Sequence, residues 1–207
     1  MFVVFTGLDG MGTSTIGNLV SKLDEGSILT RTPNDKVFTD RHDVDAALKG
    51  VSPFGHMLYY LSSVVAESDR LEKLYDPKSD NSTNIYMVRY LIDTVVSNRA
   101  AGINVPFEYN VFGHNILVPD LTVFVGGSED IRQERISARG KDNLDKVLDD
   151  YFKRVAFYRE YVKLLDSEKT LYVDNTKGTA EETAVKTYCK IKQYQNNGGI
   201  FRSGNYI

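Results

Sequence analysis

The sequence predicts an α/β fold of three layers built on a mostly parallel sheet. Short apolar runs of strand type, at residues 1–5, 85–88, 121–125 and 171–173, alternate with longer segments of helical periodicity. A glycine-rich loop joins the first apolar run directly to the first helical segment. With 207 residues, the chain is long enough for one well-buried domain, so we expect residues 1–207 to form a single unit.

The loop after the first apolar run has the composition of a phosphate-binding loop. Its glycines permit the unusual dihedrals and close approach that a backbone curled around a phosphate requires. Apolar residues then recur at helical spacing, so the loop leads into a helix N-terminus, which attracts anions. We therefore expect this loop to bind a nucleotide and the Ser14 hydroxyl to coordinate Mg²⁺. The residues expected to make the phosphate contacts are Gly7, Gly10, Met11, Gly12, Thr13, Ser14 and Thr15.

Thr13 stands where such a loop usually carries a lysine. That lysine contacts the β- and γ-phosphates and follows the transferring group, whereas threonine supplies a hydroxyl but no charge. Two interpretations stay open: another cation compensates, or nucleotide binding survives while phosphoryl transfer is slow or lost. A third interpretation is an engineered or sequencing change at this one position.

Basic residues elsewhere in the chain could supply the missing charge. Arg132, Arg135 and Arg139 are spaced i, i+3 and i+7, which predicts three guanidinium groups along one face of a helix. A solvated basic face would have the same spacing. Arg89 and Tyr90 directly follow the strand-type run 85–88, and ligands of open parallel sheets bind beyond the carboxyl ends of the strands. We therefore expect Arg89 to face the site.

Composition limits the classes of partner. The formal net charge of −3 argues against general affinity for nucleic acid, which requires a basic field. The single cysteine, Cys189, excludes an internal disulfide and is predicted to be a packed thiol. We see no signal peptide or membrane-spanning run, so we expect a cytoplasmic protein without a membrane partner. The residues from about 195 to 207 predict a loosely ordered tail.

Taken together, these motifs resemble the thymidylate kinase family, a group of P-loop nucleoside-monophosphate kinases, from Phe2 to about Lys190. The segments that carry the resemblance are 5–10, 31–33, 89–90, 119–122, 134–140 and 173–174. The resemblance implies a P-loop NTPase-type fold with a parallel five-stranded sheet and an arginine-bearing lid at about 135–150. It also implies ATP with Mg²⁺ as donor, a small nucleotide as acceptor, and a homodimer.

The resemblance further implies roles for individual residues. The catalytic residues would be Arg135 and Arg139, which close over the donor phosphates, and Asp9, which also serves the acceptor. Arg89 would hold the acceptor phosphate, and Asp174 would lie on the adenine side of the donor site. The remaining residues on the acceptor side would be Arg31, Tyr59, Tyr60, Tyr90, Ser97 and Asn98.

The chain also departs from the family pattern on the acceptor side. Val88 replaces the family's aspartate before the substrate arginine, so an acidic group near the acceptor is expected to be absent. Ser97 and Asn98 stand where family members carry a tyrosine and a glutamine that exclude the 2′-hydroxyl and bracket the base. Besides a thymidylate-kinase-like enzyme, two alternatives therefore stay open: a nucleotide-binding protein with weakened catalysis, and a kinase for a different or modified nucleoside or nucleotide.

Overall fold

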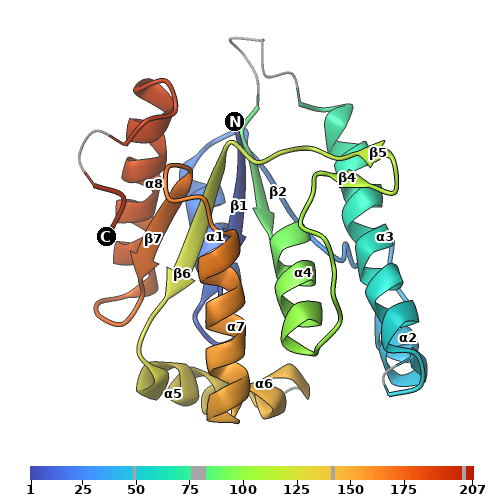
Figure 1. Cartoon of the computed structure of the whole chain (residues 1–207). Helices are drawn as coiled ribbons and strands as arrows, with labels where there is room; N and C mark the ends of the chain where they lie inside the picture. The colour runs from blue at the N-terminus through green and yellow to red at the C-terminus, as the bar shows by residue number, and fades with distance from the viewer. Residues whose placement is uncertain (49, 76–82, 141–142, 202–203) are drawn as a thin grey trace.

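The computed structural model describes residues 1–48, 50–75, 83–140, 143–201 and 204–207. It contains a five-stranded parallel sheet with the strand order β2-β3-β1-β6-β7, which confirms the predicted fold class (Figure 1). The strands are β1 (Phe2–Thr6), β2 (Ile28–Arg31), β3 (Ile85–Val88), β6 (Leu121–Gly126) and β7 (Thr170–Asp174). The order reverses at β1, so the loop that follows β1 lies at the switch point where such sheets bind ligands.

Helices cover both faces of the sheet. Gly17 packs against Phe5 and Val88 on one face, and Tyr161 packs against Phe124 on the other. Because parallel strands are buried on both sides, the central strands read as continuous apolar runs. The helices are α1 (Thr13–Leu23), α2 (Arg41–Leu48), α3 (Pro53–Glu72), α4 (Leu91–Ala100), α5 (Glu129–Arg139), α6 (Asn143–Leu148), α7 (Tyr151–Leu164) and α8 (Ala180–Asn196).

A small antiparallel hairpin, which the sequence did not predict, lies beside α3 in Figure 1. It consists of β4 (Asn110–Val111) and β5 (His114–Asn115). Phe112 and Gly113 at its tip both have positive φ angles, of 51° and 86°, as a two-residue hairpin turn with the right twist requires. His114 Nε2 lies 2.7 Å from Asp69 Oδ1 of α3. The hairpin is therefore tied to the helix that it covers.

Parts of the tail that was predicted to be loosely ordered pair with the rest of the fold, while residues 202 and 203 lie outside the described residues. Helix α8 continues to Asn196, and residues 205–207 pair with the edge strand β7. Tyr172 N donates to Asn205 O (2.7 Å) and Asp174 N donates to Ile207 O (2.8 Å). The Tyr206 ring stacks on that of Tyr172, with centroids 4.8 Å apart. Backbone pairing to an otherwise open edge thus orders a segment whose composition is typical of a loop.

Cys189 is exposed on α8, so the prediction of a packed thiol was wrong. The helical period places Thr187 and Ile191, rather than Cys189, against the core. Among the helices described, none is long and apolar enough to cross a membrane.

Candidate functional site

Four chain segments meet at the carboxyl edge of the sheet, because the strands that precede them are parallel. The glycine loop follows β1, Arg89 follows β3, helix α5 comes after β6, and Asn175 follows β7. Together they enclose a cavity of about 340 Å³. Its lining comprises Leu8, Asp9, Gly10, Gly12, Thr13, Ser14, Thr15, Arg89, Arg135, Arg139, Asn175 and Ala180. The structure therefore brings most of the predicted phosphate loop together with three of the predicted arginines.

The loop has the conformation of an anion site. Gly10 and Gly12 have φ angles of 84° and 89°, in the left-handed region that side chains rarely adopt. A Cβ on Gly12 would also lie 2.6 Å from Asn175 Nδ2. Helix α1 begins directly after Gly12, and no side chain caps its first N–H groups. These N–H groups, together with the positive end of the helix dipole, therefore lie at the edge of the cavity.

Thr13 is buried in this cavity lining, with 4% of its surface exposed. Its Oγ1 atom has no hydrogen-bond partner in the part of the chain that the structure describes. A buried hydroxyl without a partner is uncommon and suits a site that a polar ligand completes. Thr13 therefore lies where a phosphate-loop residue should lie, although it brings no charge.

Two residues bind the backbone carbonyl of Met11 in the loop. The Met11 side chain is itself buried. Arg135 Nη1 and Asn175 Nδ2 both donate to Met11 O, at 3.1 and 2.9 Å. Arg135 Nη2 also donates to Asn175 O at 2.9 Å. Asn175 was missed at the sequence level, although its position directly after a buried strand was a usable signal. Arg139 lines the same cavity, while residues 141 and 142 of the predicted lid lie outside the described residues.

The expectation of one basic face required Arg132 to share the environment of Arg135 and Arg139, but it does not. Its side chain is fully buried, Nε donates to Asp9 O at 2.8 Å, and Nη1 donates to Glu129 Oε1 at 2.8 Å. The i, i+3, i+7 spacing places the three arginines on one side of α5, but that side packs against the loop. Arg132, which packs directly against the loop, is therefore buried.

Arg89 is held at the end of β3 by both its backbone and its guanidinium. Its φ angle is 67°, its N–H bonds to Phe5 O (3.0 Å), and its carbonyl accepts from Thr32 Oγ1 (2.9 Å). The guanidinium donates to Asp93 Oδ1 at 2.6 Å and also to Asp9. Burial opposes the charge, but the two carboxylates outweigh it, so the pKa of Arg89 is raised. Arg89 is thus a fixed cation at the cavity.

That no acidic group replaces the family's aspartate near Mg²⁺ and the acceptor stays a prediction. Asp93 supplies a carboxylate beside Arg89, although it is not among the described residues that line the cavity. It comes from the first turn of α4 rather than from the position of Val88. Its Oδ1 accepts from Thr6 Oγ1 (2.7 Å) and Tyr161 OH (2.9 Å) as well as from Arg89. Burial first and then the Asp93 charge raise the pKa of Tyr161, which therefore stays a neutral donor. The i, i+4 spacing of Arg89 and Asp93 was the signal for this pair.

Tyr59 and Tyr60, predicted on the acceptor side, do not line the cavity in the described structure. Tyr60 OH donates to both carboxylate oxygens of Asp45, at 2.8 and 2.9 Å, and so ties α3 to α2. Burial first and then the Asp45 hydrogen bond raise the pKa of Tyr60. The ring of Tyr59 meets that of Phe38 edge to face, with centroids 5.5 Å apart. Both tyrosines are thus engaged by neighbouring side chains.

The predicted residues of the α4 segment are likewise engaged within the protein. Tyr90 is 1% exposed and donates to Leu117 O at 3.1 Å. Ser97 Oγ and Asn98 Nδ2 both donate to Thr94 O, at 3.1 and 2.8 Å. As far as the chain is described, none of the three lines the cavity.

Two further predicted residues lie at strand ends outside the cavity lining. Arg31, at the end of β2, forms an exposed ion pair with Asp35 at 3.7 Å. Asp174 ends β7, and its Oδ1 accepts from Thr176 N at 3.0 Å. Asp174 therefore shapes the turn that follows β7 and is adjacent in sequence to the cavity residue Asn175.

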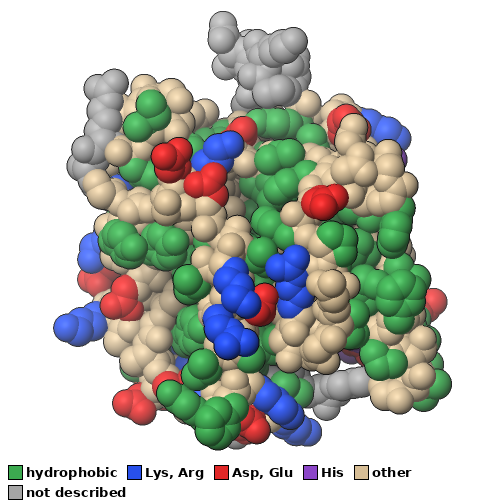
Figure 2. Space-filling model, in the orientation of Figure 1, with side chains coloured by type: hydrophobic (Ala, Val, Ile, Leu, Met, Phe, Trp, Pro, Cys, Tyr) green, Lys and Arg blue, Asp and Glu red, His purple; other side chains and the backbone are tan. Residues whose placement is uncertain are grey.

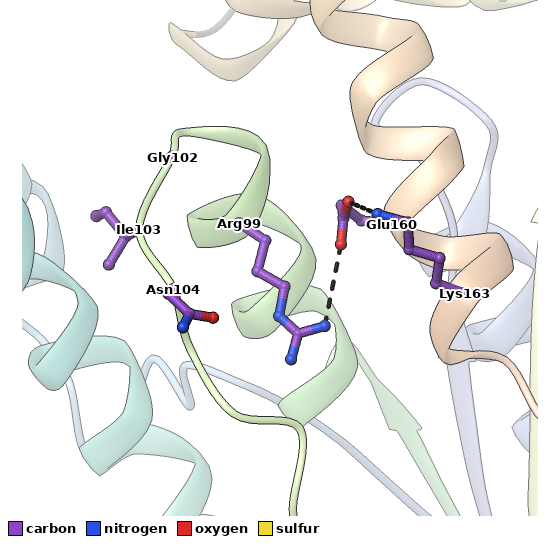
Figure 3. A pocket seen from close by; sticks show the side chains of 6 residues that line it. All are labelled: Arg99, Gly102, Ile103, Asn104, Glu160 and Lys163. Atoms are coloured by element: carbon purple, nitrogen blue, oxygen red, sulfur yellow. Dashed lines mark hydrogen bonds and ion pairs between the residues drawn. The ribbon is translucent and has the colours of Figure 1, made fainter.

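A second hollow, of about 410 Å³, lies on the surface between α4 and α7 and shares no described lining residue with the first (Figure 3). Glu160 lies between two cations there, 2.6 Å from Lys163 Nζ and 3.9 Å from Arg99 Nη1. Figure 2 shows basic side chains gathered over these two helices. Because Glu160 already pairs with both cations, we treat this patch as a solvated charged surface.

The fold and the cavity define a P-loop protein of the nucleoside-monophosphate kinase class. The match between a Thymidylate kinase family model and residues 5–186 of this chain is consistent with that class. The chain belongs to the thymidylate kinase family.

Individual relatives agree with this assignment. The chain is 29% identical over 181 residues to the thymidylate kinase of Mycoplasma mobile, covering 81% of this chain and 84% of that protein. It is 24% identical over 194 residues to the thymidylate kinase of Campylobacter jejuni strain RM1221, covering 94% of this chain and 99% of that protein. These relatives match 81% and 94% of the chain.

Solved structures share the fold at lower identity. The thymidylate kinase of Candida albicans superposes with a TM-score of 0.71 at 14% identity, covering 96% of this chain and 92% of that one. The deoxyadenosine kinase of M. mycoides, solved with dCMP and dCDP, gives a TM-score of 0.68 at 16% identity, covering 93% of this chain and 100% of that one. These likenesses concern the fold alone.

Proposed function

We propose that the chain transfers the γ-phosphoryl group of ATP to a nucleoside monophosphate of the thymidylate type. The observation that carries this proposal is the single cavity in which the glycine loop, Arg89, Arg135 and Arg139 converge. Phosphoryl transfer requires positioning and positive charge more than covalent chemistry from the protein. Arg135 and Arg139 at this cavity would supply that charge without a loop lysine, while Arg89 is held by Asp9 and Asp93.

On the donor side, the loop N–H groups and the uncapped start of α1 would hold the phosphates of ATP. Arg135 lies against the loop through Met11 O, and Arg139 lines the cavity next to it. We propose that these two arginines take over the electrostatic role that a lysine at Thr13 would have. On the acceptor side, Arg89 would bind the acceptor phosphate, with Asp9 and Asp93 fixing its guanidinium.

The residues present also fit Mg²⁺. Ser14 lines the cavity at the first turn of α1, and its hydroxyl is an oxygen ligand of the kind that Mg²⁺ prefers. Within the described ranges, no group of three or more His, Cys, Asp or Glu side chains is placed to hold a metal ion. This suits an ion held mainly by nucleotide phosphates and water. When bound, Mg²⁺ would neutralise phosphate charge during transfer.

A screen of acceptors tests the proposed reaction. Purified protein is incubated with ATP, Mg²⁺ and each nucleoside or nucleoside monophosphate, covering pyrimidine and purine bases with ribose and deoxyribose. We expect ADP to form with a deoxynucleoside monophosphate, with dTMP among the best acceptors. An Arg89→Met variant should lose activity mainly through the acceptor KM. Transfer to nucleosides alone would overturn the assignment of Arg89 to an acceptor phosphate.

A nucleotide-binding protein with weakened catalysis is the competing function, and Thr13→Lys separates the two. Because Arg135 and Arg139 already bring two cations to the cavity, we expect the added lysine to change turnover by no more than about tenfold. A rise by several orders of magnitude would identify the native protein as a weakened kinase. We also propose the homodimer and the cytoplasmic location implied by the family resemblance; light scattering and fractionation test them.

A further inference from the structure

Arg132 has an unusual environment for a charged side chain. It is fully buried, and its Nη2 has no hydrogen-bond partner among the described residues. Leaving part of a guanidinium buried and unpaired is costly, so such a group calls for an explanation. We propose that Arg132 is a positioning residue that turns the Asp9–Gly10 peptide toward the donor phosphates and supplies a fixed positive charge behind the loop. This inference rests on the proposed function.

The orientation of the peptide follows from its planarity. In a trans peptide, the C=O of one residue and the N–H of the next point in opposite directions. Arg132 Nε fixes Asp9 O at 2.8 Å on the buried side of the loop, so the Gly10 N–H is turned away from Arg132. Gly10 lines the cavity, and the Gly10 N–H has no partner within the described part of the chain. It is therefore available to an anion in the cavity.

The same arrangement recurs two residues later in the loop. Met11 O is fixed by Arg135 Nη1 and Asn175 Nδ2, and the N–H of the next residue, Gly12, likewise has no partner as far as the chain is described. Alternate carbonyls are thus bound on the protein side, while alternate N–H groups stay unpaired. The Met11 N–H between them donates to Leu8 O at 3.2 Å, so the loop offers two alternate N–H groups to an anion rather than a continuous series. Arg132 fixes the peptide that carries the first of these two groups.

The charge of Arg132 is only partly neutralised. Its carboxylate partner, Glu129, is 34% exposed and also pairs with Arg154 Nε at 3.2 Å. Two guanidinium groups thus share one carboxylate, which leaves a net positive charge at this point. Arg132 packs directly on the loop, since a Cβ on Gly10 would lie 2.9 Å from Arg132 Cγ. The buried cation therefore lies on the loop that lacks a lysine at Thr13.

Titration calorimetry with ATP in the absence of an acceptor tests the inference without requiring turnover. Arg132→Met, which removes the charge and the hydrogen bond to Asp9 O, should weaken ATP binding at least about tenfold. Arg132→Lys keeps the charge and should bind ATP more tightly than Arg132→Met. Arg154→Met is the comparison variant, because it removes a guanidinium from the same carboxylate and leaves the hydrogen bond from Arg132 to Asp9 O intact. It changes only the balance of charge behind the loop, so it should weaken ATP binding far less than Arg132→Met, by no more than about twofold.

Glu129→Gln distinguishes an electrostatic role from a structural one. It removes the carboxylate that offsets Arg132, so it should lower the Tm yet bind ATP as tightly as the unmodified protein or more tightly. If Arg132 were merely structural, Glu129→Gln would weaken ATP binding as Arg132→Met does. Equal ATP affinities for the unmodified protein and Arg132→Met would overturn this inference alone. No ATP binding by the unmodified protein would overturn the proposed function as well.

Discussion

The carboxylate of Asp93 is the group that fixes Arg89, and its neutralisation should cost both stability and acceptor binding. Asp93 accepts from Thr6 Oγ1 (2.7 Å), Arg89 Nη1 (2.6 Å), Tyr161 OH (2.9 Å) and Tyr90 N (3.0 Å), with 11% of its side chain exposed. Asp93→Asn keeps the shape but removes the charge. An amide also cannot accept all of these bonds, because one of its ends is a donor.

The size of the expected loss of stability depends on which partner Arg89 keeps in the variant. Breaking a buried ion pair costs roughly 3–5 kcal/mol, but Arg89 keeps Asp9, so we expect a loss of about 2–3 kcal/mol for Asp93→Asn. For a domain of this size, each kcal/mol lowers the Tm by about 2–4 °C, which predicts a fall of about 4–12 °C. A loosened Arg89 should also raise the acceptor KM about tenfold with little change in the ATP KM.

Asp9→Asn is the control for stability. The Asp9 side chain is 21% exposed, and its carboxylate has one hydrogen-bond partner, Arg89, among the described residues. We expect it to cost about 1 kcal/mol. Differential scanning calorimetry and steady-state kinetics on both variants provide the comparison. An unchanged Tm for Asp93→Asn, or a larger loss for Asp9→Asn, would show that Asp93 is not the main anchor of Arg89.

Two further predictions concern the rest of the fold. Burial alone would raise the pKa of Glu67, but hydrogen bonds from Arg70, Thr30 and Asn34 outweigh it and hold the pKa below its ordinary value. A carboxylate with a lowered folded-state pKa stabilises the fold above its unfolded pKa of about 4.3, and this contribution is lost as the pH falls through the folded value. Urea denaturation between pH 7 and pH 3 should therefore show a shallower acid loss for Glu67→Gln; an identical acid profile would contradict the pairing. Asn205 Nδ2 donates to Ser167 O (2.9 Å) and Thr170 O (2.8 Å), so Asn205→Ala should cost about 1–2 kcal/mol and speed hydrogen exchange at the Tyr172 and Asp174 amides. Unchanged exchange at these two amides would show that the tail does not depend on Asn205.

The sheet and its phosphate loop could be predicted from the sequence because each rests on local pattern. Buried parallel strands read as short apolar runs, and the glycines at 10 and 12 mark backbone conformations that other residues avoid. Arg89 could be placed at the site because it directly follows such a run. The carboxyl edge of a parallel sheet then fixes its location.

The environment of a single side chain depends on which side of its helix packs against the rest of the protein. Periodicity in the sequence does not show which side that is. Spacing grouped Arg132 with Arg135 and Arg139, yet α5 turns Arg132 into the protein and Arg135 toward the loop. The pairing of residues 205–207 with β7 was missed for a related reason. It is a contact between segments distant in sequence that composition does not report. Asn175 and Asp93 were missed although each had a local signal: Asn175 directly follows a buried strand, and Asp93 lies four residues after Arg89.

Arginines at the cavity, rather than a loop lysine, are proposed to support phosphoryl transfer. The rate of ADP formation from ATP, Mg²⁺ and the best nucleoside monophosphate tests this proposal directly when measured for the unmodified protein and for Arg139→Ala. Removing a cation that stabilises the transferring group costs about a hundredfold or more in comparable sites. We expect measurable transfer by the unmodified protein and a loss of that size in the variant, with the fold retained. An equal rate in both proteins, or no transfer by the unmodified protein, would contradict the proposal.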